Sequence, residues 1–310
     1  MQYSISSLSK RIRMSQFYIF ETVLNHGSIS SASKSLHLSQ PAVTKTIQDL
    51  EEILGQQLFI RTAQGVQPTE FGLMLEQHVK KLTTDIRHLV DDLNHWNTGI
   101  SGRIVIGTML TASSDLLPRA ILRLKDLAPN VAIEIKVGVN TILYPELANG
   151  EVDVVLGILP VDYSASQSLL HTPLFKETLC AVVGRENPLA TQLSENWFKS
   201  QSLSWLIPPI ATAAGKAVQQ FFKDLDIKTP LRVIESVSIM ANIAILTDSN
   251  FVALMPSSIA HRFIQLGLLN MLPLKNSVYL GEVGYTLHKD RPVTPACQRF
   301  IDTLKTLGPV

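Results

Sequence analysis

The distribution of apolar residues changes abruptly at residues 97–102, and this change constrains the fold more than any other feature. Residues 15–65 hold short helical patterns broken by turn residues, and residues 68–96 hold one long helical pattern. After residue 102, short runs rich in β-branched residues alternate with helical stretches. The sequence therefore predicts a helical N-terminal part and a separate α/β part in this chain of 310 residues.

Charge and cysteine content restrict the function only weakly. The net charge is +1, so the chain as a whole gives no sign of nucleic-acid binding, although a DNA-binding module can be local. The two cysteines, Cys180 and Cys297, fit a reducing cytosol and form no zinc or disulfide pattern. The sequence shows no signal peptide and no apolar run that could span a bilayer. We expect a cytoplasmic protein in which residues 1–14 form a flexible tail.

Three short helices are predicted in residues 15–55. Residues 25–27 stop the first helix. Ser28 can cap the second helix, Ser39 can cap the third, and Gly55 is placed to end it. Only residues 37–39 join the second helix to the third, which is the geometry of a helix-turn-helix whose second helix enters the major groove. A three-helix bundle without a nucleic-acid role is the alternative.

The outer face of the third helix carries candidate DNA contacts. Its polar residues are Gln40, Thr44, Lys45 and Gln48, which can donate to base edges and phosphates. Residues 57–61 and 66–67 are predicted to form a wing, with Arg61 placed to reach a phosphate or the minor groove. The wing argues against a plain bundle, and also against a small-molecule-binding protein that merely carries a helical dimerisation segment.

Residues 27–55 closely resemble the helix-turn-helix of LysR-type transcriptional regulators, as do residues 58–62 and 68–72. The resemblance implies a winged helix-turn-helix over residues 15–67. The DNA contacts that it implies are Ser30, Gln40, Pro41, Thr44, Lys45, Arg61 and Thr69. Ser31 and Ser35 stand where members often carry a basic or longer polar residue, so we expect thinner phosphate contacts from the second helix.

The module is barely basic, so one copy should bind DNA weakly and function should require at least a dimer. The long helix predicted over residues 68–98 carries a heptad seam suited to this role. The seam consists of Leu75, Val79, Leu82, Ile86, Leu89, Leu93 and Trp96. Packing of this stripe on the protein's own core is the alternative. In the family resemblance, the helix corresponds to the linker helix that pairs two DNA-binding modules.

From residue 103 the chain resembles the two-lobed, periplasmic-binding-protein-like effector domain of the same family. The predicted strands are 103–107, 131–137, 152–156, 179–183 and 251–255, and the predicted helices are 116–127, 141–149, 216–225 and 239–246. This alternation favours a largely parallel sheet. The resemblance implies a first lobe of residues 103–161 and 269–310, a second lobe of residues 162–268, and two crossing strands. The expected fold class is α/β, preceded by the helix-rich module and the linker helix.

Ligands in such folds bind beyond the carboxyl ends of strands, at helix N-termini and between lobes. The candidate effector residues at such positions are Thr111, Ala112, Ser113, Asn140, Thr141, Ala211, Thr212, Ser236 and Ser238. Each of these residues alone can be an ordinary helix cap, but together they favour a ligand-binding site in the cleft between the lobes. Ile158 stands where some relatives place an arginine. The residue types suit a small neutral or mono-anionic metabolite, and sugar derivatives and aromatic acids both remain open.

An enzyme is the rival class, but the sequence contains no GxSxG, HExxH, P-loop or dinucleotide-binding motif. No histidine pair has metal-ligand spacing, and Cys180 lies in an apolar strand where an inert thiol is expected. We therefore predict a sequence-specific transcription regulator without metal or cofactor. Its expected partners are double-stranded DNA, a second copy in a dimer or a dimer of dimers, a small-molecule effector and RNA polymerase, with no membrane.

Overall fold

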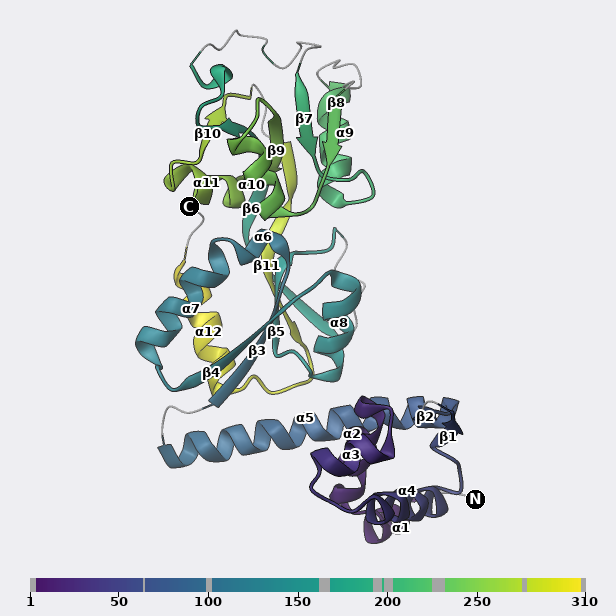
Figure 1. Ribbon diagram of the computed structural model, residues 1–310. Helices are drawn as coiled ribbons and strands as arrows, with labels where there is room; N and C mark the ends of the chain where they lie inside the picture. Colours follow the sequence, from purple (N-terminus) through teal and green to yellow (C-terminus); the bar gives the residue numbers. More distant parts are fainter. Residues whose placement is uncertain are drawn as a thin grey trace. The chain divides into compact units, whose positions relative to one another are not determined.

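The computed structural model describes residues 4–63, 65–98, 102–161, 168–191, 197, 203–224, 232–274 and 278–307 (Figure 1). Within the long helix, the side chains of residues 88, 91–92 and 94–98 lie outside the description, so the predicted seam position Trp96 does too. The chain divides into two compact units. They are Met1–Leu93 with Asn149–Glu151, and Asn94–Ala148 with Val152–Val310.

The N-terminal unit consists of helices and one short hairpin. Its elements are α1 (Ile5–Arg11), α2 (Met14–His26), α3 (Ile29–Ser35), α4 (Gln40–Leu54), β1 (Phe59–Thr62), β2 (Gly65–Pro68) and α5 (Glu70–Thr98). Helix α1 shows that the prediction of a flexible tail over residues 1–14 was wrong. The tail prediction failed because the Ser-rich segment offers few apolar residues, yet Leu8 and Ile12 pack against the core of the unit.

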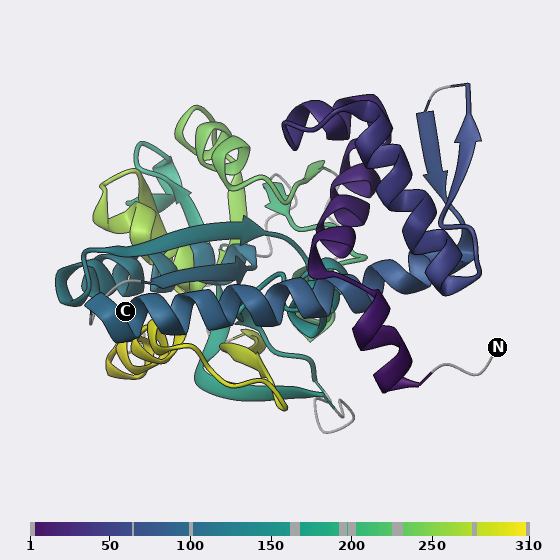
Figure 2. The same ribbon diagram turned by 90° about the horizontal axis from the view of Figure 1, so that it is seen from below.

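The turns between these helices lie where the sequence predicts them. Gly27 and Gly55 follow α2 and α4 with φ of 61° and 62°, a left-handed conformation that suits a residue without a Cβ. The hydroxyls of Ser28 and Ser39 cap α3 and α4, each accepting from the amide three residues later at 3.4 Å. Helices α3 and α4 thus form the predicted helix-turn-helix, and the β1–β2 hairpin projects from the unit as its wing (Figure 2).

One apolar core holds the helices of this unit together. Phe20, Val43 and Leu50 from α2 and α4 are completely buried in it. Leu75 and Val79 of α5 belong to the same core, with 8% and 1% of their surface exposed. These two positions therefore pack inside their own protomer, which corrects their assignment to the dimer seam. The physical reason is that the first turns of α5 cover an apolar face that the three shorter helices leave open.

The wing is tied to the helices by hydrogen bonds that its backbone amides donate. The carboxylate of Glu51 in α4 accepts from the amide of Leu58 at 2.7 Å. The amide of Val66 donates to the carbonyl oxygen of Gly27 at 2.9 Å. Gly65 has a φ of 137°, and a Cβ there would lie 2.2 Å from the Gly27 carbonyl oxygen. The close approach of the wing to the α2–α3 turn therefore requires glycine.

The second unit is an α/β domain. Its strands are β3 (Gly102–Thr108), β4 (Val131–Val137), β5 (Val154–Ile158), β6 (Leu169–Gly184), β7 (Ser204–Ile207), β8 (Arg232–Glu235), β9 (Val252–Pro256), β10 (Leu269–Leu272) and β11 (Val278–His288). Its helices are α6 (Leu110–Ser113), α7 (Leu116–Leu127), α8 (Asn140–Asn149), α9 (Ala213–Asp224), α10 (Ile239–Thr247), α11 (Ser257–Gln265) and α12 (Pro295–Thr306), with a 3-10 turn at Pro188–Ala190.

Among the described residues, a nine-stranded sheet runs in the order β4-β3-β5-β11-β6-β9-β7-β8, with β10 beside β6. The pairs of β3 with β4 and β5, and of β7 with β8 and β9, are parallel, as the strand–helix alternation predicts. All pairs made by β6 and β11 are antiparallel. The sheet is therefore mixed rather than largely parallel. Two of its four antiparallel pairs involve β11, a strand whose bounds the sequence does not predict.

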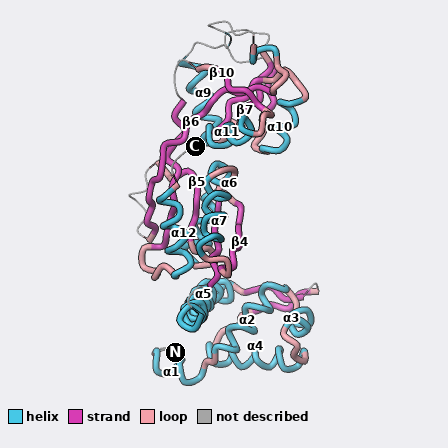
Figure 3. Tube along the Cα trace, turned by 90° about the vertical axis from the view of Figure 1, so that its left-hand side faces the viewer, coloured by secondary structure: helices cyan, strands magenta, loops and turns pink. Residues whose placement is uncertain are grey.

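Strands β6 and β11 run side by side through both lobes (Figure 1), and Figure 3 shows β6 passing between the lobes. They are the two crossing strands that the resemblance implies, although the bounds of β11 were not predicted. Leu174 and Phe175 of β6 pack in the first lobe with α7 and α12. Leu269 and Leu272 of β10 pack in the second lobe. The first lobe therefore continues past the predicted boundary at residue 162 into β6, and the second lobe continues past the predicted boundary at residue 269 through β10.

The contact between Glu51 and the wing yields a stability prediction. Replacing Glu51 with Ala leaves the partly buried amide of Leu58 without its acceptor, which costs about 1–3 kcal/mol. We expect Glu51→Ala to lower the unfolding free energy of the N-terminal unit by that amount in urea denaturation. Glu52→Ala, which removes an exposed carboxylate one residue later, is the matched control. Equal midpoints for the two variants would contradict the role of Glu51.

Candidate functional site

The outward face of α4 gathers most of the predicted DNA contacts. Gln40, Pro41, Lys45 and Gln48 are exposed, and Thr44 is half-buried. The opposite face of α4 is fixed in the core by Val43 and Ile47. Gln40 and Pro41 occupy the first turn, where free amides and partial positive charge suit a phosphate. The helix thus presents one polar surface of the kind that reads base edges.

The remaining predicted contacts come from three different elements. Ser30 of α3 and Arg61 of β1 are exposed. Thr69 is half-buried, and its hydroxyl donates to the carbonyl oxygen of Gln57 at 2.7 Å and accepts from the amide of Gly72 at 2.9 Å. This hydroxyl is therefore already engaged at the start of α5, where it joins the helix to the wing.

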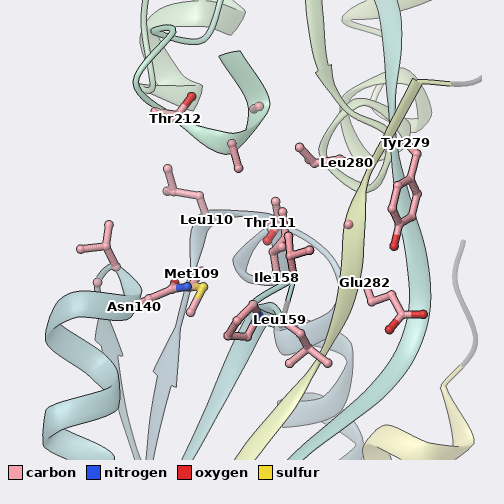
Figure 4. Close-up of a pocket in the computed structure, with 17 residues that line it drawn as sticks. Met109, Leu110, Thr111, Asn140, Ile158, Leu159, Thr212, Tyr279, Leu280 and Glu282 are labelled. Carbon is pink, nitrogen blue, oxygen red and sulfur yellow. The ribbon is translucent and has the colours of Figure 1, made fainter. Parts of the chain in front are cut away.

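A cavity of about 510 Å³ lies between the lobes of the α/β unit, and we call it the outer chamber (Figure 4). Thr111 and Asn140 from the first lobe and Thr212 from the second lobe line it, as predicted from their places at helix N-termini. Ile158, at the end of β5, also lines it. The carboxyl ends of the parallel strands thus open into the cleft, as expected for this class of sheet.

A second cavity of about 290 Å³ continues the first into the second lobe, and we call it the inner chamber. Leu110, Thr111 and Thr212 line both chambers, so the two are contiguous. Predicted residue Ser236 lines the inner chamber, together with Asn242 of α10. The remaining inner walls are mainly apolar and come from the ends of β7 and β9 and from α10 and α11.

Five predicted effector residues line neither chamber. Ala112 is completely buried in the core of the first lobe, and the hydroxyl of Ser113 donates within its own helix at 2.8 Å. Ser238 caps α10, accepting from the amide three residues later at 3.4 Å. Thr141 and Ala211 are exposed outside the chambers. Adjacent residues in a helical turn point in different directions, so a helix start at the cleft does not bring all its side chains into the cavity.

Several residues that line the chambers were not predicted from the sequence. Tyr279, Leu280 and Glu282 belong to β11, the strand that was not predicted. Met109 immediately follows β3, and Asn242 lies in the second turn of α10, beyond the first turn on which the prediction was based. A search for strand-like alternation after residue 277 would have found the first three.

Hydrogen bonding and charge in the chambers are unevenly distributed. The Thr111 hydroxyl and the Asn242 carbonyl oxygen are buried and have no hydrogen-bond partner among the described residues. An unmet buried hydrogen bond of this kind costs about 1–3 kcal/mol, which a ligand can recover. Among the described residues that line the two chambers there is no lysine, arginine or histidine, and Glu282 is the one charged group.

A buried carboxylate lies at the centre of the crossing strand β6. Glu177 is 2% exposed and accepts from the hydroxyl of Ser258 at 2.5 Å and from the amide of Thr178 at 3.1 Å. The Ser258 hydroxyl also lies 3.2 Å from the Thr111 carbonyl oxygen, which joins α11 to α6 of the other lobe. Burial raises the pKa of Glu177 above its ordinary value, although the hydrogen bonds from Ser258 oppose this.

The two cysteines of the unit lie in its cores. Cys180 and Cys297 are buried, free thiols. Burial raises the pKa of Cys180 to about 11, so little reactive thiolate forms at neutral pH. The described part of the chain contains no cluster of three histidine, cysteine or acidic side chains that could hold a metal ion. No described helix is long and apolar enough to cross a membrane.

Comparison with known families identifies both units. Residues 14–73 match the model of the bacterial regulatory helix-turn-helix proteins of the LysR family, and residues 97–308 match the LysR substrate-binding domain. The chain belongs to the LysR family. It is therefore a DNA-binding transcriptional regulator with an effector-binding domain.

Individual LysR-type proteins are similar over nearly the whole chain. GbpR of Azospirillum brasilense is 26% identical over 300 residues, which cover 96% of this chain and 87% of that protein. PcaQ of Agrobacterium fabrum is 27% identical over 91% of both chains. The structure of CbnR in complex with its target DNA superposes with a TM-score of 0.68 at 18% identity, covering 95% of this chain and 99% of that one. This last likeness shows the shared fold.

The raised pKa of Glu177 yields a pH prediction. As pH rises above 4.5, the ordinary pKa of a glutamate, Glu177 keeps its proton longer in the folded state than in the unfolded state. The protonated Glu177 therefore favours folding at low pH, and this stabilisation is lost as pH rises through the raised pKa of Glu177 in the folded state. Glu177→Gln keeps a neutral side chain at all pH values. We expect it to melt at a higher temperature than the wild type at pH 8, with the difference vanishing near pH 4.

Glu186→Gln is the control for this experiment, because it removes an exposed carboxylate from the same lobe. The measurement is the melting temperature of each full-length variant across the pH range. Parallel pH profiles for wild type and Glu177→Gln would show that the buried carboxyl does not titrate as proposed.

Proposed function

We propose that this LysR-family regulator binds its operators as a dimer or a dimer of dimers, and that a small molecule between the lobes of its effector domain sets their transcription. The observation that carries the proposal is the pair of contiguous chambers lined from both lobes, with a buried unpartnered polar atom on each side. Thr111 comes from the first lobe and Asn242 from the second. A ligand that hydrogen-bonds to both residues favours one arrangement of the lobes. The ligand thereby shifts the protein toward that conformation.

On the DNA side, the exposed strip of α4 supports sequence reading in the major groove. Gln40 and Gln48 supply amides that suit base edges, whereas Lys45 supplies a charge for a phosphate or a guanine. Arg61 on the exposed wing suits a phosphate or the minor groove, and Ser30 suits a backbone contact. Pro41, Thr44 and Thr69 complete the proposed surface.

The dimer is supported by the part of α5 that lies beyond the core of its own module. Leu82, Ile86, Leu89 and Leu93 are 41–56% exposed on one helix and follow heptad spacing. A row of large apolar side chains left in solvent on a long helix is a surface for a partner helix. Each module alone is barely basic, so pairing also supplies the phosphate contacts that one copy lacks.

Control of transcription then follows from lobe movement. A ligand that changes the closure of the lobes changes the geometry of the assembled modules, hence the DNA bend and the recruitment of RNA polymerase. Membership in a family of regulators favours this role over an enzymatic one. Genome-wide mapping of bound DNA, followed by footprinting with and without candidate metabolites from neighbouring genes, tests the proposal. Footprints unchanged by a proven ligand would refute it.

The proposed phosphate contact of Lys45 predicts a change in salt dependence. For Lys45→Ala we expect weaker operator binding and a shallower slope of log affinity against log salt, by about 0.9 per lost contact and roughly 2 per dimer. The measurement is fluorescence anisotropy on a mapped operator at several salt concentrations. Lys305→Ala removes an exposed lysine from α12 as the control. An unchanged slope for Lys45→Ala would mean that this lysine contacts no phosphate.

The exposed stripe of α5 predicts the effect of charging it. The double change Leu82→Glu and Ile86→Glu places four carboxylates in a paired seam of two copies, so we expect monomers by sedimentation and loss of operator binding. The double change Asp85→Ala and Lys81→Ala alters exposed residues next to the stripe and should leave the mass unchanged. Dimers that persist in the glutamate variant at micromolar concentration would place the interface elsewhere.

A further inference from the structure

The inner chamber differs chemically from the outer chamber. Leu206, Ile239, Met255 and Ile259 give it apolar walls, whereas Asn140, Tyr279 and Glu282 of the outer chamber do not reach it. Its volume of about 290 Å³ exceeds the ~150 Å³ cavity that is enough for benzene. The inner chamber therefore has room for one six-membered ring with a substituent.

Four polar side chains line the inner chamber, and they differ in whether they are free to bind. The Thr212 hydroxyl already donates to the Pro209 carbonyl oxygen at 2.7 Å, and the Ser236 hydroxyl accepts from the Ser238 amide at 3.1 Å. The Thr111 hydroxyl and the Asn242 carbonyl oxygen have no partner among the described residues. The buried polar atoms of the chamber that lack a partner among the described residues therefore belong to one hydroxyl and one amide.

A hydroxyl is the ligand group that satisfies this pair. It can donate to the Asn242 oxygen and accept from the Thr111 hydroxyl, and it remains suitable if the amide turns over. A carboxylate is disfavoured, because the described residues that line the two chambers include no lysine, arginine or histidine to compensate its charge. The helix starts nearby are also satisfied in part by their own side chains. Thr212 accepts from the Gly215 amide at 3.0 Å in α9.

We propose that the inner chamber binds an uncharged ring compound that carries a hydroxyl, of which phenol is the simplest. The ring packs against Leu206, Met255 and Ile259, and the hydroxyl bridges Thr111 of the first lobe and Asn242 of the second. This inference rests on the proposed effector role of the cleft and specifies the chemistry that the cleft selects.

The test measures binding of small probes to the full-length protein by calorimetry at pH 7. Phenol is the probe, toluene lacks the hydroxyl, and benzoate replaces the hydroxyl with a charged carboxylate. We expect saturable binding of phenol, and binding at least about tenfold weaker for toluene and benzoate, the factor for one hydrogen bond lost. Benzoate or toluene binding as tightly as phenol would overturn the proposal, as would the absence of phenol binding at millimolar concentration.

Two variants locate the binding. Thr111→Val and Asn242→Leu remove the polar atoms while keeping similar volume, and we expect each to weaken phenol binding at least about tenfold. Thr306→Val, an exposed threonine of α12, is the matched control and should bind as the wild type does. Phenol binding that is unchanged in both chamber variants would overturn the assignment. The comparison of probes on the wild type stands even if one variant fails to fold.

Operator binding, measured in parallel, separates this inference from the proposed function. If phenol binds through Thr111 and Asn242, the chamber chemistry is correct whether or not the operator footprint responds, and an unresponsive footprint counts against effector control alone. If phenol fails to bind a preparation that still binds its operator, the chamber inference is wrong and DNA binding is unaffected.

Discussion

The antiparallel pairing of β6 with β11 is the interaction on which the effector domain depends. The two strands pair from His288 opposite Leu169 to Val278 opposite Leu179, and so pass through both lobes. Their register shifts between Tyr279 and Gly281, where β11 lines the outer chamber. Irregularities of this kind disrupt a ladder locally and increase its twist. One of the two register shifts of this strand pair thus lies in the wall of the outer chamber.

The buried carboxylate of Glu177 lies directly opposite Gly281 in this ladder. Gly281 has a φ of 154°, and a Cβ there would lie 2.9 Å from the side chain of Ile158, so the strand passes close to β5 only as glycine. From Glu177, hydrogen bonds lead to Ser258 in the second lobe and to the Thr111 carbonyl oxygen in the first. These hydrogen bonds therefore join the irregular part of the β6–β11 pair to both lobes. A change in the arrangement of the two lobes changes the geometry of these bonds.

Local chemistry made much of this structure predictable, and tertiary context explains the rest. The caps at Ser28 and Ser39 and the glycine stops at Gly27 and Gly55 depend on a few neighbouring residues, and all four are where the sequence places them. The alternation of β11 is a local signal that was not used, whereas its pairing with β6 joins residues about a hundred positions apart and has no local signal. Without β11, one wall of the cleft and the lobe boundaries could not be placed. The unmet hydrogen bond of Asn242 depends on its surroundings in three dimensions and carries no signal in the sequence.

Helix α5 shows why a regular apolar spacing alone cannot assign a surface. Leu75 and Val79 share the period of Leu82 and Ile86, because packing on one's own core and pairing with a partner helix both need one apolar side of a helix. Burial separates them, since the first pair lies in the module core and the second is about two-fifths exposed. The module core thus extends past residue 67 to at least Val79, and the exposed stripe continues on the same helix. A partner bound to that stripe would be joined to α4 through a continuous helix and a packed core, so pairing would fix the orientation of the reading surface as well as its number of copies.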